Sequence, residues 1–223
     1  MATLRLPYAQ VELLAVGLDV DGVLRNTAYS AYIALCKTVE ELGGTTPSFD
    51  RFVRDYESDF HAYYRQCGVL NLEQVCSVYT RHIGTTEENA FPFADVKSFL
   101  THLECLDIKV FVVSSHPAEK LHDWFTAHNI DDHILRVYGG SRNKRTCIKN
   151  ACEDIGVDPK SACYVGDWGL DMRAAKAAGL TPIGITRGYT SRAGLMLSGA
   201  ACVVDHLDEL VCLIKNQHDW EGA

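Results

Sequence analysis

The sequence predicts an α/β protein in which a three-layer core, a parallel sheet between helices, carries a small inserted helical domain. Two patterns lead to this prediction. From Val96 onward, short apolar runs alternate with amphipathic segments, and continuous apolar runs are typical of strands buried on both faces of a parallel sheet. Between Thr27 and Ile83, in contrast, apolar residues recur with helical spacing and form no convincing strand.

The first strand is expected at the apolar run Leu13–Leu18, after which the pattern becomes helical. A helix at Thr27–Leu42 is expected to end at Gly43-Gly44, because glycine suits the position just after a helix C-terminus. Ser48 is suited to cap a second helix that runs through Phe52 and Tyr56. Further helices are expected at 60–67 and 72–83, and Thr85 and Glu88 have the spacing of a capping box.

The alternation that follows supplies the rest of the sheet. Each strand is a short apolar run, and each intervening helix carries one apolar face. Strands are expected at 108–113, 134–138, 162–165, 181–185 and 201–204, and helices at 96–106, 118–128, 144–155 and 171–178. The strand at 201–204 is the last predicted element.

Composition restricts the class of function. The 223 residues carry a net charge of −8 and are 47% hydrophobic, which suffices for a real core and argues against nucleic acid as the partner. No apolar stretch approaches the roughly 18–20 residues that span a membrane, and the first residues do not resemble a signal peptide. The nine cysteines contain no Cys-x-x-Cys, so we expect small buried thiols in a reducing, cytoplasmic compartment rather than a zinc or redox site.

Two pairs of aspartates follow predicted strands. Asp19 and Asp21 come directly after the first strand, at a turn that Gly22 allows, and Asp167 and Asp171 follow a later one. On its own, the first pair is equally compatible with an ordinary turn whose aspartates cap backbone groups. Ligands bind at the carboxyl ends of strands in such sheets, so we expect all four carboxylates around one pocket.

Four carboxylates in one pocket need cations. Two like charges ~4 Å apart repel by about 4 kcal/mol at an effective dielectric of ~20. A hard divalent ion with oxygen ligands, for which we take Mg²⁺, would relieve this repulsion together with a lysine. Because Mg²⁺ also leaves positions for water and a phosphate oxygen, the grouping predicts phosphoryl chemistry.

Residues that could bind the phosphoryl group follow two other predicted strands. Ser114 and Ser115 end the second strand, where a hydroxyl and a backbone N–H can donate to a phosphoryl oxygen. Lys144 opens a helix and could neutralise a phosphate. Arg142 and Arg145 lie so close in the sequence that these residues alone do not decide among the three.

Taken in order, these residues resemble the four motifs of the haloacid dehalogenase-like (HAD) hydrolase superfamily. The motifs are Asp19-x-Asp21-Gly22-x-Leu24, Ser114 after an apolar run, Lys144, and Gly166-Asp167-x-x-x-Asp171. The segment 179–189 and the later Val203-Val204-Asp205 are similar to the phosphoglycolate phosphatase branch. The resemblance covers about residues 14–212 and implies a Rossmann-like core at 1–25 and 92–223, with a helical cap at 26–91.

The resemblance also implies catalytic roles. Asp19 would attack phosphorus and form an aspartyl-phosphate, and Asp21 would act first as general acid and then as general base. Mg²⁺ would be held by the carboxylates of Asp19 and Asp167 and by the backbone carbonyl of Asp21. The implied partner is a small phosphorylated metabolite, and the protein would be a monomer or homodimer.

The phosphoryl group itself would be bound by Ser114, Ser115 and Lys144. Asp171 would orient Lys144 or serve in the outer shell of the metal. His116 stands where relatives have other residues after the serine. It would either touch the substrate or simply begin the next helix, and the second interpretation is slightly favoured.

The cap would select the substrate, and Arg51 and Arg54 are its candidates for contact with a carboxylate or hydroxyl. Phosphoglycolate is the named substrate that the resemblance suggests. Lys37, the only lysine between residues 26 and 95, lies early in the first cap helix, which argues against a phosphonatase with a cap lysine. A sugar phosphomutase with the same two aspartates and a catalytically silent interaction module remain alternatives.

Overall fold

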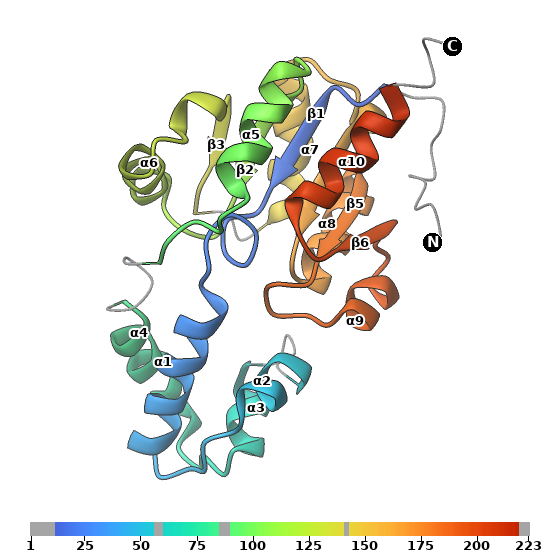
Figure 1. Ribbon diagram of the computed structural model, residues 1–223. Coiled ribbons are helices and arrows are strands. Elements are labelled where there is room, and N and C mark those ends of the chain that lie inside the picture. Colours follow the sequence, from blue (N-terminus) through green and yellow to red (C-terminus); the bar gives the residue numbers. More distant parts are fainter. Residues whose placement is uncertain (1–11, 56–59, 85–89, 141–142, 219–223) are drawn as a thin grey trace.

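A six-stranded parallel sheet forms the centre of the protein in a computed structural model that describes residues 12–55, 60–84, 90–140 and 143–218 (Figure 1). The sheet order is β3-β2-β1-β4-β5-β6. The strands are β1 (Ala15–Leu18), β2 (Lys109–Val113), β3 (Arg136–Tyr138), β4 (Ala162–Gly166), β5 (Thr181–Ile185) and β6 (Cys202–Val204). The predicted fold class is confirmed.

The register of the central strands brings their carboxyl ends level. Leu18 of β1 pairs with Val112 of β2 on one side and with Val165 of β4 on the other. From β1 the chain first builds outward through β2 and β3 and then returns to build β4, β5 and β6 on the opposite side. Beside β1 the strand order therefore changes direction, which is where open α/β sheets bind ligands.

Helices cover both faces of the sheet and complete the three layers. On one face, α5 (Val96–Cys105), α6 (Ala118–Ala127) and α10 (Leu207–His218) pack around a buried cluster that includes Leu18 and Val112. On the other, α7 (Lys144–Ile155) and α8 (Gly169–Ala178) pack around Phe111 and Tyr164. Figure 1 shows α5 and α10 in front of the sheet and α7 behind it.

Two helices were not predicted. α9 (Arg192–Leu197) is six residues long, too short to show a period, and Ser191 caps it by accepting a hydrogen bond from Gly194. α10 follows β6 and buries Leu207, Leu210 and Ile214 on one face. The expectation that the cysteines are buried is only partly right, because Cys76, Cys105 and Cys212 are exposed, although all nine are free thiols.

A helical insertion lies between β1 and β2. It consists of α1 (Ala28–Glu41), α2 (Phe49–Asp55), α3 (Phe60–Gln66), the 3-10 turn Leu72–Gln74 and α4 (Val75–Ile83). As predicted, Ser48 caps α2, since its hydroxyl accepts from the N–H of Arg51. Thr85, Glu88 and Tyr56 lie outside the described residues.

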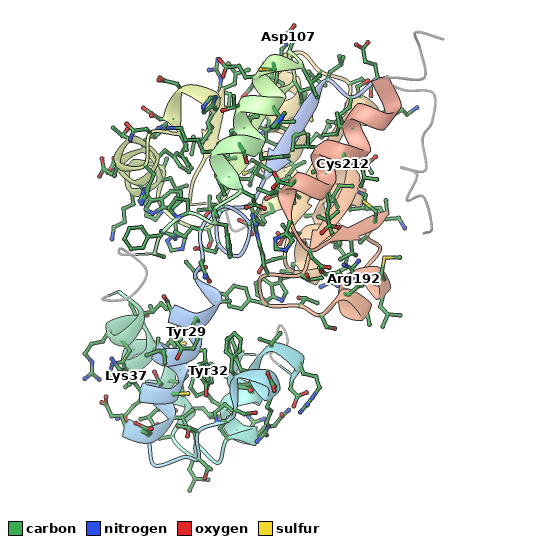
Figure 2. All side chains as sticks on the ribbon, viewed as in Figure 1. Tyr29, Tyr32, Lys37, Asp107, Arg192 and Cys212 are labelled. Carbon is green, nitrogen blue, oxygen red and sulfur yellow. The ribbon has the colours of Figure 1, made fainter. Side chains whose placement is uncertain are left out.

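The insertion has its own hydrophobic centre and joins the core through two segments. Phe52 and Tyr63 are buried in this centre, and the ring of Tyr32, seen on α1 in Figure 2, lies 5.2 Å from that of Phe49. The joining segments, 24–27 and 90–93, are hydrogen-bonded to each other, and we call them the connector. The domain boundaries after residues 25 and 91 stay a prediction.

None of the helices in the described ranges is long and apolar enough to span a bilayer.

Candidate active site

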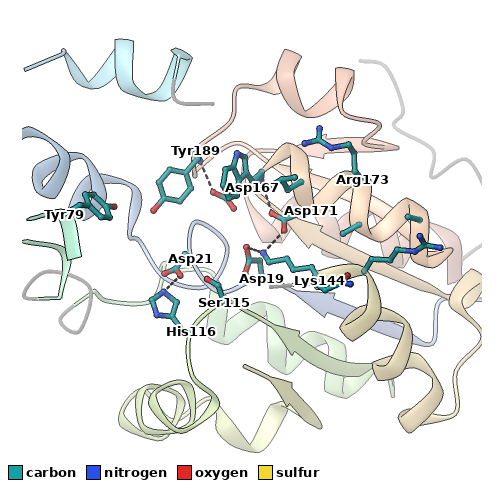
Figure 3. Close-up of a pocket in the computed structure, with 16 residues that line it drawn as sticks. Asp19, Asp21, Tyr79, Ser115, His116, Lys144, Asp167, Asp171, Arg173 and Tyr189 are labelled. Atoms are coloured by element: carbon teal, nitrogen blue, oxygen red, sulfur yellow. Dashed lines mark hydrogen bonds and ion pairs between the residues drawn. The ribbon is translucent and has the colours of Figure 1, made fainter. Parts of the chain in front are cut away.

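Asp19 is held at the end of β1 by both of its carboxylate oxygens. The backbone N–H of Val20 donates to Oδ1 at 2.8 Å, and the ammonium of Lys144 donates to Oδ2 at 2.6 Å. The side chain is almost fully buried, and its own N–H bonds to the carbonyl of Val165 on β4. Both oxygens therefore have fixed positions at the edge where the strands end (Figure 3).

Asp167, in the turn between β4 and α8, and Asp171, in the first turn of α8, face the same point. The N–H of Tyr189 donates to Asp167 Oδ2 at 2.9 Å. Asp171 accepts Lys144 on Oδ1 at 2.6 Å and the N–H of Trp168 on Oδ2 at 3.1 Å, so it also caps α8. Lys144 thus joins Asp171 to Asp19 across the pocket.

The buried charges of this cluster do not balance. Burial raises the pKa of Asp19 to about 7; Lys144 opposes this effect, whereas Asp171 adds to it. Burial, with the charges of Asp171 and Asp19, raises the pKa of Asp167 well above its usual value. For Lys144, burial disfavours the ammonium, but Asp171 and Asp19 outweigh it and raise the pKa well above its usual value. When all three carboxylates are ionised, one lysine leaves them with an excess of negative charge, which is why their protonated forms are favoured without a further cation.

The cluster fits a hard divalent cation. Carboxylate oxygens of Asp19, Asp167 and Asp171 lie within 4.8 Å of one another, and all three residues are buried. Oxygen donors of this kind suit Mg²⁺, whose charge would offset the excess. Asp19 and Asp171 each accept one hydrogen bond from Lys144 and one from a backbone N–H, so these bonds alone do not decide which carboxylates would be direct ligands.

Asp21 has a different environment. Arg25 Nε donates to Oδ1 at 2.8 Å, and His116 Nε2 lies 2.8 Å from Oδ2. Burial alone would raise the pKa of Asp21, but the hydrogen bond from His116 and the charge of Arg25 outweigh it and lower the pKa to about 2. The pKa values of Asp19 and Asp21, the two aspartates of the first motif, are thus shifted in opposite directions.

The serines after β2 lie at the same edge. Ser114 is buried, and its hydroxyl accepts from the N–H of His116 at 3.2 Å, while Ser115 lines the pocket. The favoured interpretation of His116 is wrong: α6 begins at Ala118 behind Pro117, so the histidine precedes the helix and its ring reaches Asp21.

A cavity of about 590 Å³ opens over these groups. Besides the residues above, it is lined by several that the sequence did not single out: Tyr79, Asn143, Trp168, Leu170, Arg173, Ala174, Ala177 and Tyr189. Tyr79 is the contribution of the helical insertion within the described residues. Its place on the buried side of α4 resembles an ordinary core position in the sequence, so no signal marked it.

The basic candidates separate clearly. Lys144 contacts Asp19 and Asp171, whereas Arg145 lines the cavity and Arg142 lies outside the described residues. Arg51 and Arg54 both pair with Asp55 within the insertion and are not among the residues that line the cavity. Lys37 does not line it either, and its side chain is exposed on α1.

Comparison with known proteins gives a consistent result. Residues 17–185 match the family described as haloacid dehalogenase-like hydrolase. A phosphoglycolate phosphatase of Escherichia coli K12 is 27% identical over 147 residues, which are 63% of this chain and 58% of that protein. The match thus spans less than two thirds of the length of this curated relative.

Solved structures share the fold over almost the whole chain. A HAD family hydrolase of Deinococcus radiodurans, solved with bound phosphate and sodium, has a TM-score of 0.78 at 18% identity, covering 94% of this chain and 98% of that one. A protein of Thermotoga maritima described as a candidate beta-phosphoglucomutase has a TM-score of 0.68 at 18% identity, covering 92% and 99%.

Proposed function

The chain belongs to the haloacid dehalogenase-like hydrolases, and on that premise we propose that it is a Mg²⁺-dependent phosphatase of small phosphate monoesters. The observation that carries the proposal is the position of Lys144, whose ammonium joins the buried carboxylates of Asp19 and Asp171 beside Asp167. A nucleophilic carboxylate held next to a cation and a metal-binding pair is suited to phosphoryl transfer, in which catalysis is mostly positioning and charge neutralisation.

In the proposed reaction Asp19 supplies the nucleophilic oxygen. It attacks phosphorus, the bond to the leaving oxygen breaks, and Asp21 gives that oxygen a proton. Water then attacks the phosphorus of the aspartyl-phosphate while Asp21 takes its proton, which releases phosphate and restores Asp19. Asp21 is ionised in the structure and thus ready for the second step. The phosphate dianion of an arriving substrate favours its protonated form for the first.

The remaining residues bind the phosphoryl group and the metal. Ser114, Ser115 and Lys144 are proposed to hold the phosphoryl oxygens at the edge of the sheet. Mg²⁺ is proposed to be held by Asp19, Asp167 and the backbone carbonyl of Asp21. When bound, it supplies positive charge for the phosphoryl oxygens.

Phosphoglycolate is the substrate we propose to test first. The E. coli relative is named for it and matches this chain over 147 residues. No basic side chain of the described insertion lines the cavity, so among the described residues the partners we propose for a substrate carboxylate are His116, Arg145 and Arg173.

The proposal is tested by phosphate release from a panel of small esters, including phosphoglycolate, glucose 1-phosphate and an aryl phosphate, with Mg²⁺ and with EDTA. Metal-dependent release that prefers one ester is expected. Isomerisation of the sugar phosphate without net release would favour a phosphomutase. Metal binding without any turnover would favour a silent module.

Asp19→Asn tests the nucleophile. We expect turnover to fall to background while the folded state survives, because burial already disfavours the charged form of this side chain. The measurement is phosphate release together with the thermal midpoint, and Asp123→Asn on the exposed side of α6 is the matched control. Substantial residual activity in Asp19→Asn would contradict the assignment of Asp19 as the nucleophile.

A further inference from the structure

Arg25 is a buried cation that the proposed reaction does not use. It is 6% exposed, although arginine is rarely buried unless it is paired. Its Nε donates to Asp21 Oδ1 at 2.8 Å, and its terminal nitrogen NH2 lies 2.8 Å from the same oxygen. Behind it, the guanidinium carbon lies 5.8 Å from the ring centre of Trp124. The arginine is thus packed from behind and aimed at one carboxylate.

Backbone hydrogen bonds of the turn hold Arg25 next to Asp21. The N–H of Gly22 bonds to the carbonyl of Arg25 at 2.9 Å, and the N–H of Arg25 bonds to the carbonyl of Val20 at 2.9 Å. Gly22 has a φ of +69°, a conformation that glycine adopts without strain. Asn26, the residue after Arg25, lies within the connector, and its N–H bonds to the carbonyl of Phe91. Backbone contacts therefore fix Arg25 on both sides.

The two oxygens of Asp21 have unequal neighbours. Oδ1 faces Arg25, which does not line the cavity, whereas Oδ2 faces His116, which does (Figure 3). A ligand in the cavity can compete with the ring of His116 for Oδ2, but it cannot displace a buried arginine. Oδ2 is therefore the oxygen available to a leaving group or a water, and Oδ1 is the anchored one.

We propose that Arg25 is a positioning residue for the acid–base step, holding Asp21 by Oδ1 so that Oδ2 points at the leaving group. Resting on the proposed phosphatase function, this inference concerns only the proton transfer by Asp21. The attack by Asp19 and the binding of the phosphoryl group do not involve Arg25. The loss of kcat/KM in a variant of Arg25 should therefore be larger for a leaving group that needs a proton than for one that does not.

The test compares two substrates in Arg25→Gln. General acid catalysis contributes about 10²–10⁴ in rate when the leaving group needs protonation. We expect kcat/KM to fall on the order of 100-fold for an alkyl phosphate and less than about tenfold for 2,4-dinitrophenyl phosphate. Equal losses on both esters, or no loss on either, would overturn the proposal. Wild-type protein that releases no phosphate from any ester would instead refute the phosphatase function itself.

Arg187→Gln is the matched control. Arg187 is likewise enclosed: it pairs with Asp95 at 2.6 Å, and its guanidinium lies 4.0 Å from the ring centre of Phe93. Arg187 also donates to the carbonyl of Val23, but it makes no ion pair with Asp21, so losses in this variant should be equal on the two esters. If Arg25→Gln does not fold, Arg25→Lys decides, since it keeps the charge and the aliphatic stem. It should show the same selective loss, reduced to about tenfold, and the absence of selectivity would overturn the inference.

Discussion

At Gly188 the backbone passes directly beside the Asp167 carboxylate. A β-carbon at this position would collide with the side-chain atoms of Asp167, including Oδ2. The next residue, Tyr189, donates its N–H to the same oxygen at 2.9 Å. Glycine is therefore needed here to let the loop after β5 approach Asp167, the proposed metal ligand. The residue at position 188 thus controls where the carboxylate of Asp167 lies.

Gly188→Ala should displace Asp167 and remove most of the stabilisation by Mg²⁺. We expect kcat/KM to fall about 100-fold, since misplacement by about 1 Å in an active site has costs of that order. The measurements are turnover and the thermal midpoint with and without Mg²⁺. Gly84→Ala, at the end of α4 with an ordinary φ of −57°, is the control and should behave like wild type. A normal Mg²⁺ response in Gly188→Ala would refute the role given to this contact.

At this scale, residues that follow strands could be predicted and residues that approach through turns could not. Asp19, Ser114 and Asp167 were placed together because the ends of neighbouring parallel strands share an edge. Arg25 reaches Asp21 only through the turn after Gly22, and Tyr189 reaches Asp167 only through the loop after β5. Nothing in the spacing of the sequence specifies those paths.

Among the elements, the helical insertion depends on an aromatic cluster. Phe52 of α2 is 1% exposed, and its ring lies 5.7 Å from Tyr32, 6.4 Å from Tyr63 and 6.2 Å from Tyr189. Tyr189 lies in the loop after β5 and lines the cavity. The aromatic cluster therefore also connects the insertion to the candidate site.

Phe52→Ala should lower the free energy of unfolding by about 3–5 kcal/mol, the usual effect of removing a buried phenylalanine. Urea denaturation measures it. Phe91→Ala makes the same change at a side chain that is 75% exposed, and it should cost less than about 0.5 kcal/mol. If the two substitutions had similar effects, Phe52 would not be a centre of the insertion.

Elements with a clear period were predictable, and the failures have two different causes. β2 and α7 were placed within a residue because an uninterrupted apolar run and an apolar helical face are strong signals. α9 has no full period to detect. α10 carries apolar residues at 207, 210, 211 and 214 with Asp208 and Glu209 in its first turn, so its sequence does contain a helical pattern.

For the whole molecule, the candidate site links stability to pH and to metal. Asp19 and Asp167 both have pKa values raised by burial, so the metal-free folded state binds protons more tightly than the unfolded state. The contribution of Asp19 to stability is complete below the unfolded pKa near 4 and is lost as the pH rises through about 7, and the contribution of Asp167 is lost in the same direction. Asp21 has the opposite sign, but with a pKa of about 2 its contribution is constant above about pH 5.

A metal ion should reverse this loss, because it binds the ionised carboxylates. Below its own pKa, which is about 7 for Asp19, a carboxylate that must lose a proton weakens Mg²⁺ binding about tenfold per pH unit. The increase in thermal midpoint on adding Mg²⁺ should therefore be small near about pH 5.5 and clearly larger near about pH 8, as thermal denaturation at both values would show. Asp167→Asn, which removes one titrating ligand, should have a smaller increase at the higher pH. An Mg²⁺ effect that is equal at both pH values, or larger at the lower, would contradict binding of the ion by these two carboxylates.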